Sequence, residues 1–221
     1  MNTQIDFEQA RLNMIEQQIR TWEVLDQNVL DLLDQIHRED FVPSDFQSLA
    51  LADTNIPLPN GQVMMTPKLE ARLLQAVALN KNDSVLEIGT GCAYLTSLIA
   101  KSSKHVDSID IFPDFTKEAK IKLENYQIEN VNLITADALS DWTDKPAYDV
   151  IIVTGSVSSL NPLWREQLTD GGRLFVISGN SPVMNAQLIT RIDKQTWSNE
   201  VVLETDLPAL IGAEEPVPFD F

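Results

Sequence analysis

The sequence is poor in cysteine and histidine. Its 221 residues include one cysteine, Cys92, and two histidines, His37 and His105. A single cysteine excludes a disulfide within the chain and a cysteine-cluster metal site, and two histidines add too few ligands for a zinc centre. We therefore expect no metal, and we expect Cys92 to act as a small apolar side chain.

Long apolar runs are also absent. No stretch of eighteen or more apolar residues occurs, and residues 1–20 contain no basic region followed by an apolar one. A membrane-spanning helix needs the first feature and a secretory signal needs the second. We therefore expect neither, and we expect a cytoplasmic location.

Basic residues are few. The chain has 16 Lys and Arg against 33 Asp and Glu, which gives a net charge of −17. A field of this sign repels phosphate backbones and anionic membrane surfaces, so we expect neither nucleic acid nor a membrane as a partner. The length is enough for one sizeable hydrophobic core, which favours a single globular unit.

The first part of the chain reads as helices followed by a long loop region. Apolar spacing predicts two helices within residues 6–40, the second capped by Asp26. Residues 47–67, with several prolines and an Asn-Gly pair, fit neither the helical nor the strand period. We therefore expect residues 1–66 to form N-terminal helices and a substrate loop, packed on a main domain of residues 67–221.

Strands and helices alternate from Thr66 onward, where a threonine N-cap and Pro67 predict a helix start. Several strands are nearly continuous apolar runs, as in a parallel sheet covered on both faces. We predict a doubly wound α/β fold with a mostly parallel seven-stranded, Rossmann-like sheet that ends in an edge hairpin. The predicted strands are residues 84–88, 105–110, 131–135, 148–154, 172–178, 186–193 and 198–207.

A glycine turn follows the first of these strands, in the stretch "VLEIGTGCAYLTSLIA". Gly89 and Gly91 allow a ligand to approach the backbone closely at a helix N-terminus. A dinucleotide fingerprint needs a third glycine five positions after Gly89, where this chain has Tyr94. The turn therefore disfavours a nicotinamide or flavin cofactor.

Three acids lie at the ends of three successive strands near this turn: Glu87, Asp110 and Asp137. Asp110 is placed to accept hydrogen bonds from ribose hydroxyls, and Asp137 from an adenine amino group. Glu87 would repel a pyrophosphate but suits S-adenosylmethionine, which has a sulfonium and an ammonium and no phosphate. The alternative, that each acid caps a helix or faces solvent, is also compatible with the sequence.

An ordered series of motifs resembles the protein-L-isoaspartate O-methyltransferases, a family within the class I S-adenosylmethionine-dependent methyltransferases. The series includes "RLNMIEQQIR", "REDFVP", "GQVMMTP", the glycine turn, "NVNLITADAL", "YDVIIVTGSV", "QLTDGGRLFVISG" and "LPALIGA". The resemblance implies transfer of a methyl group from S-adenosyl-L-methionine to the carboxyl group of L-isoaspartyl residues in damaged proteins. S-adenosyl-L-homocysteine is then the product.

Together with the glycine turn and the three acids, the resemblance implies a set of candidate cofactor contacts along the strand ends. They are Glu87, Gly89, Thr90, Gly91, Asp110, Ile111, Asp137, Ala138 and Thr154.

The substrate loop, residues 49–66, departs from the family pattern. Met65 occupies the position of the family's serine, and Thr66, the next residue, is an alternative hydroxyl that also fits an N-cap. Asp53 and Gln62 are further candidates for ordering the acceptor. Because a carboxylate acceptor is already ionised at neutral pH, the reaction needs no general base.

Two other functions fit the sequence. Met64 and Met65 would make an apolar acceptor pocket, which suits a methyltransferase acting on a different acceptor. The terminal stretch "AEEPVPFDF", with Phe219 and Phe221, suits a cofactor-binding interaction protein without catalysis. We expect isoaspartyl-containing peptides or proteins as partners, and a monomer or weak homo-oligomer.

Overall fold

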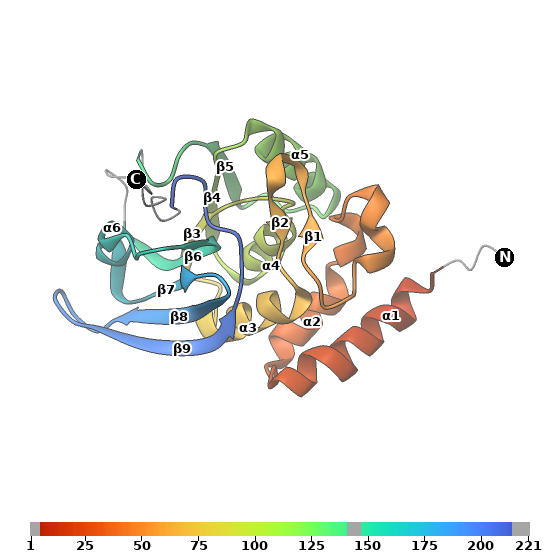
Figure 1. Cartoon of the computed structure of the whole chain (residues 1–221), viewed down its shortest axis with the longest axis horizontal. Helices are drawn as coiled ribbons and strands as arrows, with labels where there is room; N and C mark the ends of the chain where they lie inside the picture. Colours follow the sequence, from red (N-terminus) through yellow and green to blue (C-terminus); the bar gives the residue numbers. More distant parts are fainter. Residues whose placement is uncertain (1–4, 141–146, 214–221) are drawn as a thin grey trace, which may run out of the picture.

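A computed structural model describes residues 5–140 and 147–213 of the chain (Figure 1). The α-helices in this part are α1 (Phe7–Asn13), α2 (Gln27–Gln35), α3 (Pro67–Val77), α4 (Tyr94–Ser102), α5 (Pro113–Asn125) and α6 (Pro162–Glu166). The shorter helical turns are η1 (Met14–Ile19), η2 (Arg20–Trp22), η3 (Arg38–Asp40), η4 (Ser44–Leu49) and η5 (Pro59–Gly61). Phe219 and Phe221 lie outside the described residues.

The strands form one large sheet and one small ribbon. The ribbon pairs β1 (Ile56–Pro57) with β2 (Val63–Met64). The sheet contains β3 (Ser84–Ile88), β4 (His105–Asp110), β5 (Val131–Thr135), β6 (Tyr148–Val157), β7 (Leu168–Asn180), β8 (Val183–Arg191) and β9 (Trp197–Thr205). Its order is β5-β4-β3-β6-β7-β8-β9.

The sheet is parallel from β5 to β7 and antiparallel at β8 and β9. Strand order reverses between β4–β3 and β6, which is the switch point where doubly wound sheets bind ligands. This arrangement confirms the predicted fold class and the predicted edge hairpin.

Two hydrophobic clusters lie on opposite faces of this sheet, because side chains alternate along each strand. The larger cluster contains Val85 and Val106, and it includes buried residues from η1, α2, α3, α4 and α5. The second contains Leu86 and Ile109, together with Trp164 of α6. The N-terminal helices therefore share a core with the sheet.

Helix starts follow the expected capping chemistry. Asp26 accepts a hydrogen bond from the backbone N–H of Asn28, and Thr66 accepts one from that of Leu69 at 3.3 Å. Pro67 occupies the first turn of α3, where its missing N–H leaves no bond unmade. The cap fixes the point at which the substrate loop ends.

Candidate functional site

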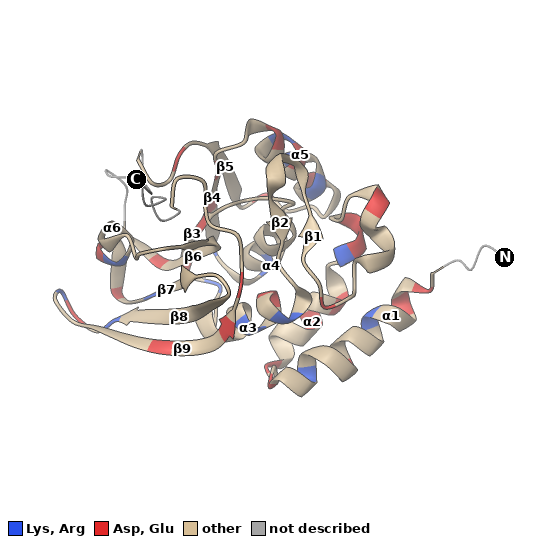
Figure 2. Ribbon diagram, in the orientation of Figure 1, with Lys and Arg blue, Asp and Glu red and all other residues tan. Residues whose placement is uncertain are grey.

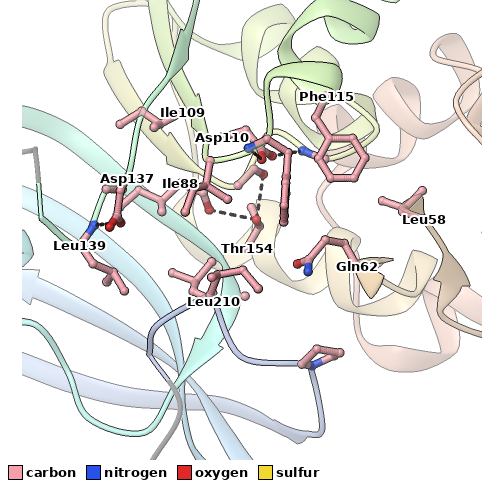
Figure 3. Close-up of a pocket in the computed structure, with 18 of the residues that line it drawn as sticks. Leu58, Gln62, Ile88, Ile109, Asp110, Phe115, Asp137, Leu139, Thr154 and Leu210 are labelled. Atoms are coloured by element: carbon pink, nitrogen blue, oxygen red, sulfur yellow. Dashed lines mark hydrogen bonds between the residues drawn. The ribbon is translucent and has the colours of Figure 1, made fainter. Parts of the chain in front are cut away.

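A pocket opens at the carboxyl ends of β3, β4 and β6, where the β1–β2 ribbon and residues 207–211 also reach (Figure 3). The pocket is partly open to solvent. The lining residues are Leu58, Gln62, Val63, Ile88, Gly89, Gly91, Ile109, Asp110, Ile111, Phe112, Phe115, Ala136, Asp137, Ala138, Leu139, Thr154, Gly155, Leu207, Pro208, Leu210 and Ile211.

The glycine turn is bonded to β6 through Thr154. Its single O–H is shared between the carbonyl oxygens of Ile88, at 2.9 Å, and Gly89, at 2.8 Å. Gly89 has a φ of +100°, and a Cβ added there would lie 2.1 Å from Thr154 Oγ1. The position therefore requires glycine for both its conformation and its space.

Asp110 ends β4 at the pocket wall. Its Oδ2 accepts a hydrogen bond from the backbone N–H of Gly91 at 2.9 Å, and its Oδ1 accepts one from that of Phe112 at 2.9 Å. Burial raises the pKa of Asp110, and the backbone N–H donors oppose that rise. Each carboxylate oxygen keeps a further lone pair, so this group can also accept from a ligand's hydroxyls.

Asp137 lies across the pocket from Gln62 and Leu58 (Figure 3). Its carboxylate caps the following turn, accepting from Leu139 N at 2.9 Å and Ser140 Oγ at 2.9 Å. Asp137 therefore has a capping role, which was one of the two interpretations that the sequence allowed, and it also lines the pocket. Ile111 and Ala138 line the pocket as well.

Glu87 and Thr90 lie beneath the turn and not in the pocket wall. Glu87 is fully buried, and its Oε2 accepts hydrogen bonds from Thr96 of α4 and Ser108 of β4, both at 2.6 Å. Thr90 shares the same network through Ser108, at 2.7 Å between hydroxyl oxygens. Because β3 side chains alternate, Ile88 faces the pocket while Glu87 faces α4.

Burial raises the pKa of Glu87 to about 8, against the lowering effect of the two hydroxyl donors. Its other oxygen, Oε1, is buried and accepts no hydrogen bond within the described residues. A protonated carboxyl group therefore fits this position at neutral pH. The side chain braces the turn from behind.

The substrate-loop candidates are not gathered at one point. Gln62 lines the pocket, and its amide donates to the carbonyl oxygen of Asn60 at 3.1 Å. Asp53 forms an ion pair with Lys68 at 3.0 Å, and the Thr66 hydroxyl caps α3. Of these three side chains, only that of Gln62 lines the pocket.

Met64 and Met65 fill the hydrophobic core. They are 3% and 5% exposed and belong to the larger cluster, and neither lines the pocket. The thioether at position 65 therefore does not make the pocket apolar. Met64 and Met65 therefore give no support to the alternative of a methyltransferase that acts on a different acceptor in an apolar pocket.

Sequence reasoning missed two parts of the site. Residues 207–210 join the pocket because Ser156 N donates to Pro208 O at 3.0 Å and Leu210 N donates to Ser156 O at 2.9 Å. Arg38, within the "REDFVP" motif, is fully buried and contacts the substrate loop. An arginine directly before two acids and an apolar run was the only sequence signal for it.

The charge of the pocket restricts its ligand. Its described lining includes the acids Asp110 and Asp137 but no Lys, Arg or His. Figure 2 shows Lys and Arg positions on several elements, among them α1 and α5. Such a wall disfavours a phosphate and suits a cationic nucleoside with ribose hydroxyls.

The residues that the structure describes contain neither a membrane-spanning helix nor a metal-binding cluster. No helix in residues 5–140 or 147–213 is long and apolar enough to cross a membrane. Within the same ranges, no group of three His, Cys, Asp or Glu side chains is arranged to hold a metal ion.

The chain matches proteins of known family over most of its length. The family model of protein-L-isoaspartate(D-aspartate) O-methyltransferase matches residues 9–209. A protein-L-isoaspartate O-methyltransferase of Koribacter versatilis is 34% identical over 82% of this chain and 81% of the relative. One from Brucella anthropi is 30% identical over 88% of this chain and 90% of the relative.

Two solved structures share the fold of this chain. A protein-L-isoaspartate O-methyltransferase superposes with a TM-score of 0.74 at 26% identity, covering 90% of this chain and 65% of that one. A Plasmodium falciparum protein, solved in complex with S-adenosyl-L-homocysteine, shares the fold at 16% identity, with a TM-score of 0.76 over 94% of this chain and 99% of its own. With a family match across both the N-terminal helices and the sheet, the chain belongs to the protein-L-isoaspartate O-methyltransferases, a family of S-adenosylmethionine-dependent methyltransferases.

Proposed function

We propose that this protein transfers the methyl group of S-adenosyl-L-methionine to the carboxyl group of L-isoaspartyl residues in damaged proteins. The observation that carries the proposal is the pocket at the switch point of the sheet, lined by two acids and by no described basic side chain. Its charge and its position suit a cationic, phosphate-free nucleoside. The family match supports the acceptor class.

The cofactor would be held by the strand ends. Asp110 would accept from the ribose hydroxyls and Asp137 from the adenine amino group, with Ile111 and Ala138 beside the base. Gly89 and Gly91 would let the turn backbone approach the amino-acid part. Glu87, Thr90 and Thr154 would act through the turn, because Glu87 and Thr90 both bond to the Ser108 hydroxyl and Thr154 donates to the carbonyl oxygen of Gly89.

The chemistry is a single displacement in which the acceptor oxygen bonds to the methyl carbon and the sulfur leaves with the bonding electron pair. The chain's own residues need not remove a proton, because the attacking carboxylate is ionised at neutral pH. Their task is to align acceptor and donor and to exclude water. The apolar wall, including Phe112 and Phe115 with ring centroids 5.9 Å apart, serves the second purpose.

On the acceptor side, Gln62 is the loop side chain placed to meet the peptide. Asp53, Met65 and Thr66 would contribute by shaping the loop, through the Lys68 ion pair, the core and the α3 cap respectively. We further propose that the protein acts in the cytoplasm on isoaspartyl-containing proteins, as a monomer or weak homo-oligomer.

The test is methyl transfer from labelled S-adenosyl-L-methionine to a synthetic isoaspartyl peptide, with the matching aspartyl peptide as the control. Selective labelling of the isoaspartyl peptide is expected. Labelling of neither peptide, in a preparation that binds S-adenosyl-L-homocysteine by calorimetry, would reject the proposed acceptor while keeping the cofactor.

The cofactor site is tested in the same calorimeter with Asp110→Ala and Gly91→Val. Both should abolish saturable binding, whereas Gly171→Val should not. Gly171 also has a positive φ, of +79°, but no atom lies within 4 Å of an added Cβ and it does not line the pocket. Unchanged affinity in Asp110→Ala and Gly91→Val would reject the assignment.

A further inference from the structure

Arg38 connects the N-terminal helices to the segment 50–65. It lies in η3 and is 1% exposed. Its Nε donates to the carbonyl oxygen of Ala50 at 2.8 Å, and its Nη2 donates to that of Met65 at 2.5 Å. Nη1 pairs with the carboxylate of Glu70, and the guanidinium carbon lies 5.1 Å from the ring centroid of Tyr94.

The two carbonyls that Arg38 holds are the two ends of one structural unit. Between them the chain forms the β1–β2 ribbon, in which Leu58 N donates to Gln62 O at 2.8 Å. Leu58 and Gln62 both line the pocket, on the side opposite Asp137 (Figure 3). One guanidinium therefore fixes both ends of the segment that forms this wall.

The surroundings of Arg38 suit the planar guanidinium group of arginine better than the ammonium group of lysine. Glu70, in the first turn of α3, is 2% exposed, and burial raises its pKa to about 7 while Arg38 acts to lower it. The ion pair compensates a charge that would be costly to bury alone. A lysine ammonium is a point charge on a flexible stem, and it cannot reproduce the fixed directions of the guanidinium.

We infer that Arg38 is a positioning residue for the methyl acceptor, clamping both ends of segment 50–65 so that Leu58 and Gln62 stay in the pocket wall. The inference rests on the proposed methyl transfer and adds to it a residue that touches neither reactant. Loss of the clamp should loosen the wall on which the peptide binds and leave β3, β4 and β6 in place.

The chain offers a matched control for this test. Arg11 is also buried, at 4% exposure, and also forms an ion pair with a buried glutamate, Glu39. Its hydrogen bond goes to Glu39 and not to a loop carbonyl. Arg38→Lys and Arg11→Lys therefore both weaken a buried ion pair, but only the first removes the clamp.

For each variant we would measure kcat and KM with an isoaspartyl peptide, the Kd of S-adenosyl-L-homocysteine, and amide hydrogen exchange. In Arg38→Lys, kcat/KM for the peptide should fall by about tenfold to a hundredfold, mainly through KM, because misplacement of about 1 Å has effects of that size. Exchange at Leu58 N–H should rise while the sheet amides stay protected. In Arg11→Lys, kcat/KM should stay within about threefold of the parent.

Equal losses in the two variants, or exchange that rises across the whole sheet in Arg38→Lys, would overturn the inference and leave Arg38 a purely structural residue. If Arg38→Lys fails to fold, the double variant Arg38→Met, Glu70→Leu removes the clamp without a buried unpaired charge. It should show the same local exchange and the same KM effect. If the parent chain is inactive on the peptide, the proposed function is rejected. The comparison of amide hydrogen exchange between Arg38→Lys and Arg11→Lys would then test by itself whether Arg38 holds segment 50–65 in place.

Discussion

Replacing Gly89 by alanine tests how the glycine turn is built. At a φ of +100° an alanine is strained by about 1–2 kcal/mol, partly offset by the lower entropy of the unfolded chain. The new Cβ would also lie 2.1 Å from Thr154 Oγ1, which must turn away and lose its bonds to Ile88 and Gly89. At about 1 kcal/mol for this one shared hydrogen bond, the total loss is about 2 kcal/mol.

Gly171→Ala is the matched control, because its φ of +79° is also positive while nothing lies within 4 Å of the added Cβ. It should cost about 1 kcal/mol, the conformational part alone. The free energy of unfolding from urea titrations gives both values. Calorimetry with S-adenosyl-L-homocysteine should show weakened binding for Gly89→Ala and unchanged binding for Gly171→Ala.

A double-mutant cycle isolates the contact between the two side chains. Thr154→Ala alone should cost about 1 kcal/mol through the loss of its one shared hydrogen bond. In the double variant Gly89→Ala, Thr154→Ala the clash is gone, so the two losses should be less than additive by about 1 kcal/mol. Additive losses, or a Gly89→Ala variant as stable as Gly171→Ala, would refute the steric account of the turn.

Two further predictions concern buried side chains, both measured by urea unfolding. Burial raises the pKa of Glu87 from 4.5 to about 8, so its stabilising contribution is complete below about pH 4.5 and is lost as the pH rises through 8. Glu87→Gln is neutral at every pH, so between pH 5 and pH 8 it should lose less stability than the parent. Equal losses in the two proteins would contradict the raised pKa of Glu87. Met65→Ser should lower the free energy of unfolding by about 2–5 kcal/mol without raising kcat on an isoaspartyl peptide, because the side chain lies in the core; a faster, equally stable variant would contradict this.

Three strands could be predicted to the residue from the sequence. The bounds of β3, β4 and β5 match the predicted ranges, although β5, at the sheet edge, has no fully buried residue. The strand β7 begins at Leu168, four residues before the predicted start. Pairing of Leu168 with Tyr148 overrides the turn preference of the intervening Asp-Gly-Gly.

The first part of the chain was harder to predict. The first predicted helix is α-helical only to Asn13 and continues as the π-helical η1 and the 3₁₀ turn η2. The loop region contains the ribbon of β1 and β2, whose two-residue strands are too short to show a period. In both places, contacts distant in sequence decide the local conformation.

The sequence predicted the site residues correctly where the end of a strand fixes their position. Asp110 and Asp137 line the pocket because the carboxyl ends of neighbouring parallel strands meet at one edge. Glu87 lies opposite Ser108 in the sheet, two residues before the level of Asp110, so it lies behind the strand ends and accepts hydrogen bonds from Thr96 and Ser108. Arg38 depends on partners 12 to 32 positions away, which no local pattern reports.

Position 65 connects these observations to the chemistry. Its side chain fills the core, but its carbonyl oxygen is held by Arg38, so what this residue gives the site is backbone placement. A reaction whose acceptor is already ionised needs alignment more than a proton acceptor, and alignment is set by such fixed backbone positions. Residue 65 should therefore influence peptide binding, measured as KM, through the position of its backbone and not through its side chain.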